Sequence, residues 1–369
     1  INQIHKKITT YNQKCGQHRN THHTHAHTHT HTHTMDALLS LPVLSLFLVP
    51  TISSYSTSLN IIFFYMTWTT LVLSHPPLRV ELFGTAAVRL LFFLLPSLLF
   101  FLFDILTPSA AVVVKAQGEA GLPAGSKRGK VRMKDLKVAG WAILNIGLSF
   151  AAQAAIEEVR TELFGMRSAL RVSMKLPMPW EMVKDLLRGL LAREILTYNV
   201  HRFILHSPDY QVSKYHRKWY HSLRAPFPLT AHYDHPLAYL LSNFTPTYLP
   251  AMFFRFHMLT YLLYLTVISI EETFAFSGYS VMPTSFFLGG IARRMDMHVL
   301  SGAEGNFGPW GILDWICGTT VGGDEDEEEL EEALSEKEMI DEQIRRAIEE
   351  STRKRRDERY KLRRRRNDY

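Results

Sequence analysis

The sequence predicts an all-α integral membrane protein, a multi-span helical bundle with a histidine-rich cap that faces the cytosol. Three observations predict it. Long apolar runs dominate the first third of the chain, and several are long or nearly long enough to span a bilayer. A basic linker follows them. Finally, eight of the nine histidines after Met35 lie between His201 and His298, in segments that flank the apolar runs.

The first 34 residues are predicted to be a leader that is not part of the folded protein. Residues 27–34 alternate His and Thr, as a translated CA repeat would, and Met35 opens an apolar run typical of a true start. The leader holds half of the 18 histidines, so the alternative is a His-rich metal-binding tail. Without its four basic residues the net charge falls from +6 to +2, and nucleic acid is not an expected partner.

Residues 35–106 are expected to form the N-terminal membrane spans. Residues 58–73 and 82–105 are the predicted crossing segments, and Pro96 should kink the second without forbidding it. Residues 107–137 then form a linker rich in Gly, Ala and Pro, with seven basic and two acidic residues. The positive-inside rule places this linker in the cytosol.

Residues 138–323 are expected to form a second membrane domain. Residues 138–155 would leave the cytosol and residues 180–200 would return to it, although the charges in 180–200 also fit an amphipathic helix at the interface. Residues 237–270 are apolar over 34 positions and predict a membrane hairpin or re-entrant pair. A hairpin would bring both ends of this segment to one face, as a metal site shared by His235 and His298 requires.

Residues 324–369 are predicted to form a charged tail. Eight acidic residues lie among positions 324–333, and ten basic residues lie among positions 353–366. One interpretation is a solvated helix whose charges complement its dipole. The other is attraction of the arginine-rich end to anionic lipid on the cytosolic face.

The histidines in the second domain occur in pairs that indicate a metal site. Imidazole is a common neutral ligand for iron, and redox iron can activate O2 to attack an unactivated C–H bond. Residues five apart on an α-helix diverge by about 140°. The pairs His201/His206 and His216/His221 should therefore face each other across a metal pair or lie at helix ends. His232 and His235, three apart, can share one face.

Other side chains extend the set of possible ligands. His298 completes a series of seven candidate histidines, and His257 is a possible eighth. Oxygen ligands suited to iron are available from four carboxylates, namely Asp234, Glu271, Glu272 and Asp296. Cys317 is the only cysteine after the leader, which leaves no disulfide or cysteine-based metal site.

Residues 187–322 resemble the fatty acid hydroxylase/sterol desaturase superfamily. Residues 231–236 look like its Ala-His-x-x-His-Pro segment, and residues 306–308 and 314–319 look like its closing Asn-x-Gly and Asp-Trp-x-x-Gly-Thr patterns. By this resemblance, His201 and His206 belong to the first histidine box, and His216 and His221 to the outer positions of the second. Asp296 and His298 match the Asp and the following His of the third box.

The resemblance implies a fold, a cofactor and partners. It implies a non-heme di-iron centre, held at the cytosolic face of the endoplasmic reticulum membrane by a multi-pass protein. The seven histidines would be metal ligands and Asp296 a catalytic residue. The expected reaction is hydroxylation or desaturation of a lipid or sterol-like substrate with O2. Electrons would come from an external carrier such as cytochrome b5 or its reductase, because no Rossmann fingerprint or heme module is visible in the sequence.

Three positions depart from the superfamily pattern. Tyr220, Met295 and Val299 stand where the second and third boxes have histidine. This loss favours an alternative, a non-catalytic descendant that acts as an interaction or regulatory protein. A divalent-metal transporter is less favoured, because its histidines should lie in the middle of apolar spans.

Overall fold

The computed structural model describes residues 55–123, 131–223, 226–279, 288–300 and 305–322, together with residues 346, 350 and 353. The chain divides into two units, Ile1–Thr51 and Ile52–Tyr369, and every described residue belongs to the second. The predictions for the leader and for nearly all of the charged tail therefore lie outside the described residues.

The described elements are helices, which confirms the predicted all-α membrane fold class. In the described ranges, extended pairing is limited to two isolated bridges, Lys115 with Tyr279 and Arg171 with His257. Three helices are long and apolar enough to cross a membrane, namely Pro77–Leu106, Met133–Leu163 and Met258–Ala275.

The first long span is a kinked helix built from α4 (Pro77–Arg89), a π turn (Leu90–Leu94) and α5 (Leu95–Leu106). Pro96 has no N–H to donate to the Phe92 carbonyl four residues earlier, and a wide turn accommodates its ring. The Thr273 hydroxyl of a neighbouring helix lies 3.4 Å from this carbonyl, but its closer acceptor is the Ser269 carbonyl at 2.8 Å.

Helix α3 (Tyr55–Ser74) covers the predicted crossing segment, residues 58–73. The helix ends just before Pro76 and Pro77, because proline restricts the residue that precedes it to extended conformations.

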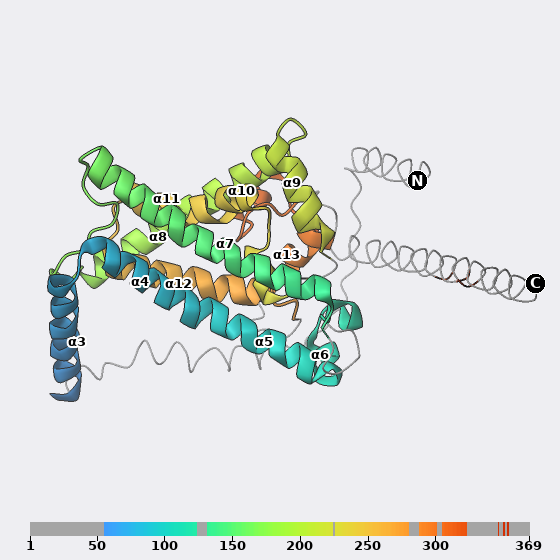
Figure 1. Cartoon of the computed structure of the whole chain (residues 1–369), viewed down its shortest axis with the longest axis horizontal. Coiled ribbons are helices and arrows are strands. Elements are labelled where there is room, and N and C mark those ends of the chain that lie inside the picture. The colour runs from blue at the N-terminus through green and yellow to red at the C-terminus, as the bar shows by residue number, and fades with distance from the viewer. Residues whose placement is uncertain are drawn as a thin grey trace, which may run out of the picture. The chain divides into compact units, whose positions relative to one another are not determined.

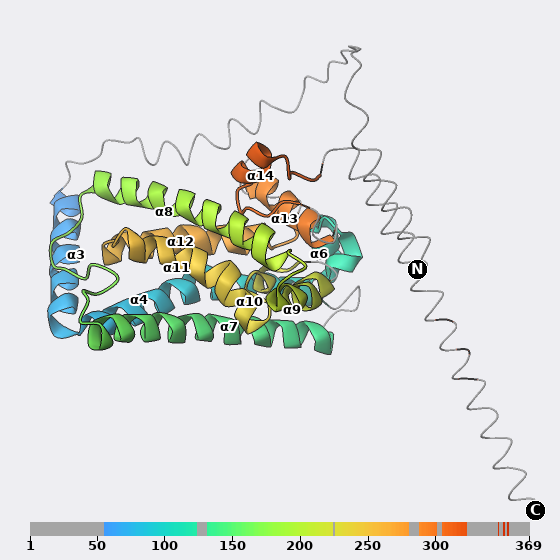
Figure 2. The ribbon, with the colours of Figure 1, turned by 90° about the horizontal axis from the view of Figure 1, so that it is seen from above.

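The bundle is formed by long helices that pack along one another. Helix α7 (Met133–Glu158) continues into a π turn (Val159–Leu163), and α8 (Pro179–Val200) brings the chain back. In Figure 2, α7 and α8 lie at opposite sides of the bundle with α4 and α12 between them. Helix α8 lies close to the rings of Phe256 and Tyr264 at Gly189, where there is no room for a side chain. A Cβ added to Gly189 would lie 2.8 Å from the ring of Phe256.

The apolar segment 237–270 reverses direction, as predicted. It contains α10 (Pro236–Tyr239), a π turn (Leu240–Phe244), α11 (Thr245–Phe253) and, after a turn at Arg255, α12 (Met258–Ala275). Asn243 near its start donates to Glu272 near its end at 3.1 Å, so both ends lie together. Only α12 of this segment is long and apolar enough for a span.

The short elements gather at the end of the bundle opposite α3 (Figure 1). They are α6 (Pro108–Val114), the 3-10 turn Gly118–Gly121, α9 (Gln211–Trp219), the 3-10 turns Tyr220–Ser222 and Pro228–His232, α13 (Gly290–Leu300) and α14 (Ile312–Cys317). The basic linker is anchored here, because Lys115 pairs with Asp104 at 2.9 Å and Gln117 donates to Asp296 at 2.9 Å.

Candidate metal centre

Five imidazoles converge between the ends of α8, α9 and α13. One ligand atom from each of His201, His206, His216 and His298 lies within 4.8 Å of the others. The ring of His221 joins them, with its centroid 5.1 Å from those of His206 and His298. Five of the seven histidines singled out in the sequence therefore meet.

The first pair meets because the backbone there is a π turn. His206 N–H donates to the His201 carbonyl at 3.0 Å, a bond across five residues that replaces the usual four. Side chains five apart then lie nearly above one another, and the two ring centroids are 4.9 Å apart. The expectation that this pair would diverge by about 140° is wrong, since it assumed an α-helix. The placement at helix ends was correct.

Hydrogen bonds at the far nitrogens fix the tautomers of three of these rings. His201 Nδ1 lies 3.1 Å from the Phe307 carbonyl, and His298 Nδ1 lies 2.6 Å from the Gly305 carbonyl. A carbonyl only accepts, so each Nδ1 must carry the proton and donate. His216 Nδ1 likewise lies 2.6 Å from the Asp234 carboxylate. In the neutral rings, each Nε2 is therefore an unprotonated lone pair.

These lone pairs point at one another inside the protein. His201 Nε2 and His216 Nε2 are 3.3 Å apart, a repulsive arrangement for two acceptors unless a cation lies beside both. His206, His221 and His298 each bury an Nε2 atom that has no hydrogen-bond partner in the described structure. Buried polar atoms are rarely left unsatisfied without a reason, and an absent ion is one such reason.

Burial favours the neutral form of four of these imidazoles, those of His201, His206, His221 and His298. It lowers the pKa of His298 to about 4 and that of His221 to about 2, and the charges of neighbouring histidines lower the latter further. The pKa values of His201 and His206 are lowered for the same reasons. Near neutral pH these four rings therefore offer lone pairs without protons, which is the state that binds a metal.

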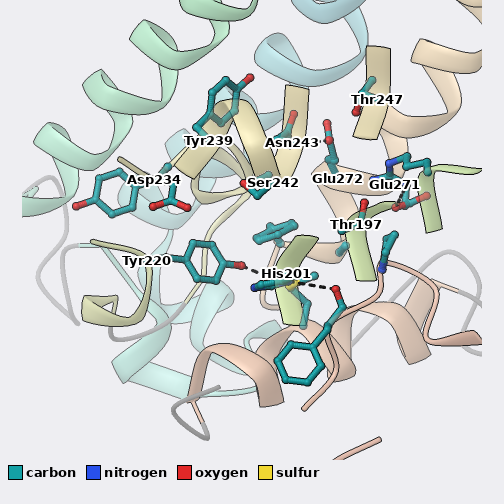
Figure 3. Close-up of a pocket in the computed structure, with 18 of the residues that line it drawn as sticks. Thr197, His201, Tyr220, Asp234, Tyr239, Ser242, Asn243, Thr247, Glu271 and Glu272 are labelled. Atoms are coloured by element: carbon teal, nitrogen blue, oxygen red, sulfur yellow. Dashed lines mark hydrogen bonds and ion pairs between the residues drawn. The ribbon is translucent and has the colours of Figure 1, made fainter. Parts of the chain in front are cut away.

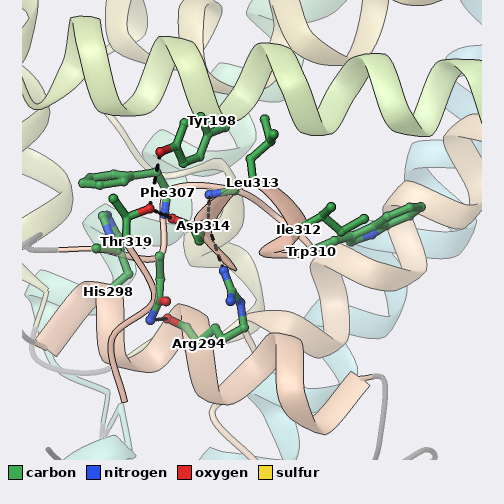
Figure 4. Close-up of polar contacts among 12 residues, drawn as sticks. Tyr198, Arg294, His298, Phe307, Trp310, Ile312, Leu313, Asp314 and Thr319 are labelled. Carbon is green, nitrogen blue, oxygen red and sulfur yellow. Dashed lines mark hydrogen bonds and ion pairs between the residues drawn. The ribbon is translucent and has the colours of Figure 1, made fainter. Parts of the chain in front are cut away.

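The closing segment 305–319 holds the carbonyls behind the histidines. The buried Asp314 carboxylate accepts the N–H groups of Phe307 and Gly308 and the hydroxyl of Thr319, each at 2.8 Å (Figure 4). Arg294 of α13 pairs with the same carboxylate at 2.9 Å. The Asn-x-Gly and Asp-Trp patterns were noted in the sequence, but their role in fixing Phe307 and His298 was not foreseen.

A second carboxylate anchors this segment to α8. Glu194 accepts the N–H groups of Trp310 at 2.8 Å and Ile312 at 2.9 Å. In the sequence, Glu194 is only one of the charges in residues 180–200 that fit an interfacial helix. The signal that could have found it is its position seven residues before His201, two turns away on the same face of α8.

The structure places His232 and His235 outside the cluster and on different faces. His232 is buried, with Nδ1 2.9 Å from the Tyr239 hydroxyl. His235 stacks on Tyr215 at a centroid distance of 4.3 Å. The expectation that they share a face fails because His235, which precedes Pro236, is extended, with ψ 137°.

Asp296 and His257 also lie outside the cluster. Asp296 accepts from Gln117, and burial raises its pKa to about 6. His257 begins α12, accepts the N–H of Leu259 at 3.2 Å and lies 3.3 Å from the Ser173 hydroxyl.

A mainly apolar pocket adjoins the histidines, and several polar side chains reach its wall (Figure 3). Its volume of about 90 Å³ is enough for several water molecules. The carboxylates on its wall have partners of their own. Glu272 pairs with Arg89 and accepts from Asn243, while Glu271 pairs with Arg193 at 2.8 Å.

Two of the three departures from the superfamily pattern contact each other at this pocket. The Tyr220 hydroxyl donates to the Met295 sulfur at 3.4 Å. The Tyr220 ring also stacks on His216, with centroids 5.1 Å apart and planes 15° apart. Val299, the third departure, is buried next to His298.

Comparison with known proteins agrees with the motifs. Residues 186–319 match the family model described as fatty acid hydroxylase. No solved structure matches the chain. The matched segment contains all five converging histidines and the Asp314 network that supports them. This match confirms the resemblance of this segment to the fatty acid hydroxylase/sterol desaturase superfamily that the histidine boxes and closing motifs predicted.

Proposed function

We propose that this protein is a membrane-bound non-heme iron oxygenase that hydroxylates or desaturates a lipid or sterol-like substrate with O2. The observation that carries the proposal is the convergence of unprotonated Nε2 atoms, two of them 3.3 Å apart. The family match supports the reaction class, and the three apolar helices support a substrate that reaches the site from the membrane.

The residues present fit a transition-metal ion. Neutral imidazoles suit iron, zinc and copper, and the Nδ1 hydrogen bonds to Phe307, Asp234 and Gly305 are of the kind that orient metal-binding histidines. Bound iron would supply the activation of O2. The chain itself holds the rings, keeps them neutral by burial and, through the pocket-facing Asn243 and Tyr239, offers hydrogen bonds to a polar group. The superfamily implies two irons.

The proposal includes an external electron donor, such as cytochrome b5 or its reductase, and a location in the endoplasmic reticulum membrane. Reduction of O2 at iron requires electrons, and the chain shows no sequence motif for a flavin, a nicotinamide or heme. The apolar helices support the membrane part of this proposal.

We further propose that the histidine end faces the cytosol. Gln117 contacts Asp296 and Lys115 pairs with Asp104, so the basic linker and the histidines lie at the same end of the bundle. Basic loops stay on the cytosolic side. A glycosylation site inserted at residues 124–130 should remain unmodified in cells, as judged by its electrophoretic mobility with and without glycosidase. Efficient modification there would reverse the orientation.

A second candidate function is the non-catalytic descendant, and the Tyr220–Met295 contact favours it. Metal analysis and product formation separate the two. Full-length protein purified in detergent should contain iron, and cells expressing it should accumulate a hydroxylated or desaturated lipid that cells expressing His201→Ala lack. Bound metal with identical lipid profiles would favour the non-catalytic protein. Absence of any bound transition metal would refute the oxygenase.

A further inference from the structure

We infer that the centre binds one transition-metal ion, in place of the two that the superfamily implies. This deepens the proposed function, because it rests on the same histidines. Nitrogen donors bound to one ion at about 2.1 Å lie about 3.4 Å apart in a tetrahedral arrangement and about 4.2 Å apart when opposite. Two ions about 3.5–4 Å apart would spread their outermost donors to as much as about 8 Å.

The observed spacing matches one ion. The ligand atoms of His201, His206, His216 and His298 all lie within 4.8 Å of one another, so a small contraction would bring all four to one centre. The separation of 3.3 Å between His201 Nε2 and His216 Nε2 already equals a tetrahedral edge. His221, in ring contact with His206 and His298, is placed as a fifth donor at the edge of the same group.

His232 lies outside the cluster, and the carboxylate beside it is engaged elsewhere. His232 Nε2 has no hydrogen-bond partner in the described structure and lies 3.3 Å from Glu272. The ring contacts of His232 in the described residues are with Phe93 and Tyr239 rather than with the five converging histidines. Glu272 also pairs with the buried Arg89. The acidic wall of the pocket is thus already neutralised by protein cations.

A second dication beside this wall would meet strong repulsion. Arg89 and Arg193 are both buried, and each holds one of the two glutamates, Glu272 and Glu271. To ligate a metal, either carboxylate would have to leave its guanidinium unpaired inside the protein, which is far more costly than at the surface. This wall is therefore built as a set of ion pairs.

The positions where the superfamily has further histidines hold poor donors. The Tyr220 hydroxyl donates to the Met295 sulfur at 3.4 Å. A phenol engaged in this hydrogen bond and a thioether are weak ligands for iron(II), and Val299 has no donor atom. The Tyr220 ring, stacked on His216, fills the space next to the five histidines.

Cobalt titration of the metal-depleted, full-length protein in detergent tests the number directly. Co²⁺ bound to imidazoles absorbs visible light, and this absorbance should saturate at one equivalent per chain. Elemental analysis of the iron-loaded protein should also give one ion. Saturation at two equivalents would overturn the inference. No binding at all would overturn both this inference and the metal site on which the proposed function rests.

A pair of variants distinguishes ligands from neighbours. His232→Gln, whose amide can still hydrogen-bond within the buried network, should titrate to one equivalent like the native protein, whereas His201→Gln should lose at least 100-fold in Co²⁺ affinity. A drop from two equivalents to one in His232→Gln would show a second ion at His232 and refute the single-ion centre. One bound ion without any lipid product would leave this inference standing and refute the oxygenase.

Discussion

Replacing His298 by alanine should strip the protein of its metal and lower lipid turnover by more than about 100-fold. Residues that merely orient a metal-binding histidine are worth 10–100-fold, and loss of a ligand exceeds that. His298 is fully buried, its Nδ1 is tied to Gly305, and its Nε2 has no partner in the described structure. Its removal leaves only three of the four closely spaced nitrogen donors to hold the metal.

His235→Ala is the matched control for this change. It also removes one imidazole from the same domain, but the His235 ring stacks on Tyr215 and lies outside the cluster. Metal content by elemental analysis and product by mass spectrometry should be nearly native in this variant. Equal metal loss in both variants would mean that the converging histidines are not the binding site. So would full metal retention in His298→Ala.

The sequence predicted the histidines better than their geometry. The pairs at 201/206 and 216/221 were recognised by number and spacing, and both pairs contribute to the cluster. The convergence of the first pair was missed because an α-helical backbone was assumed, whereas His201–Leu205 forms a π turn, whose hydrogen bonds join residues five apart. The second pair has the same spacing on a different backbone, because His216 lies in α9 and His221 in a 3-10 turn.

The opposite error occurred at the next pair. His232 and His235 have α-helical spacing, but one ends a 3-10 turn and the other is the extended residue before Pro236. Proline was visible in the sequence, and its restriction on the preceding residue could have separated the two rings. Spacing rules therefore hold only where the backbone type is known.

The spacing of residues along the sequence could not predict which polar side chains pair at the site. His216 and Asp234 are 18 residues apart, and Arg193 and Glu271 are 78 apart, yet each pair is in contact. Such contacts follow from how α8, α9 and α12 pack. The sequence predicted a helical stretch over residues 180–200 and an apolar hairpin over residues 237–270, but not α9, and the faces that these helices present to one another depend on details such as Gly189.

Replacing Asp314 by alanine should damage the centre without touching a ligand. Asp314 accepts from Phe307, Gly308 and Thr319 and pairs with Arg294. Its loss leaves buried donors and a partly buried guanidinium unpaired, which should cost about 3–5 kcal/mol of folding free energy. The Phe307 carbonyl would then lose its position behind His201, and metal affinity should fall by about 10–100-fold.

Thermal unfolding and cobalt titration in detergent measure these two effects on the same samples. Asp185→Ala is the control, since Asp185 forms ion pairs with the solvent-exposed Arg171 and Arg188, and surface pairs contribute at most about 1 kcal/mol. Asp314→Asn keeps one acceptor oxygen and should lie between the native protein and Asp314→Ala. If Asp314→Ala is destabilised but binds Co²⁺ with native affinity, the closing motif supports the fold alone. The orientation of His201 and His298 would then have to come from α8 and α13 themselves.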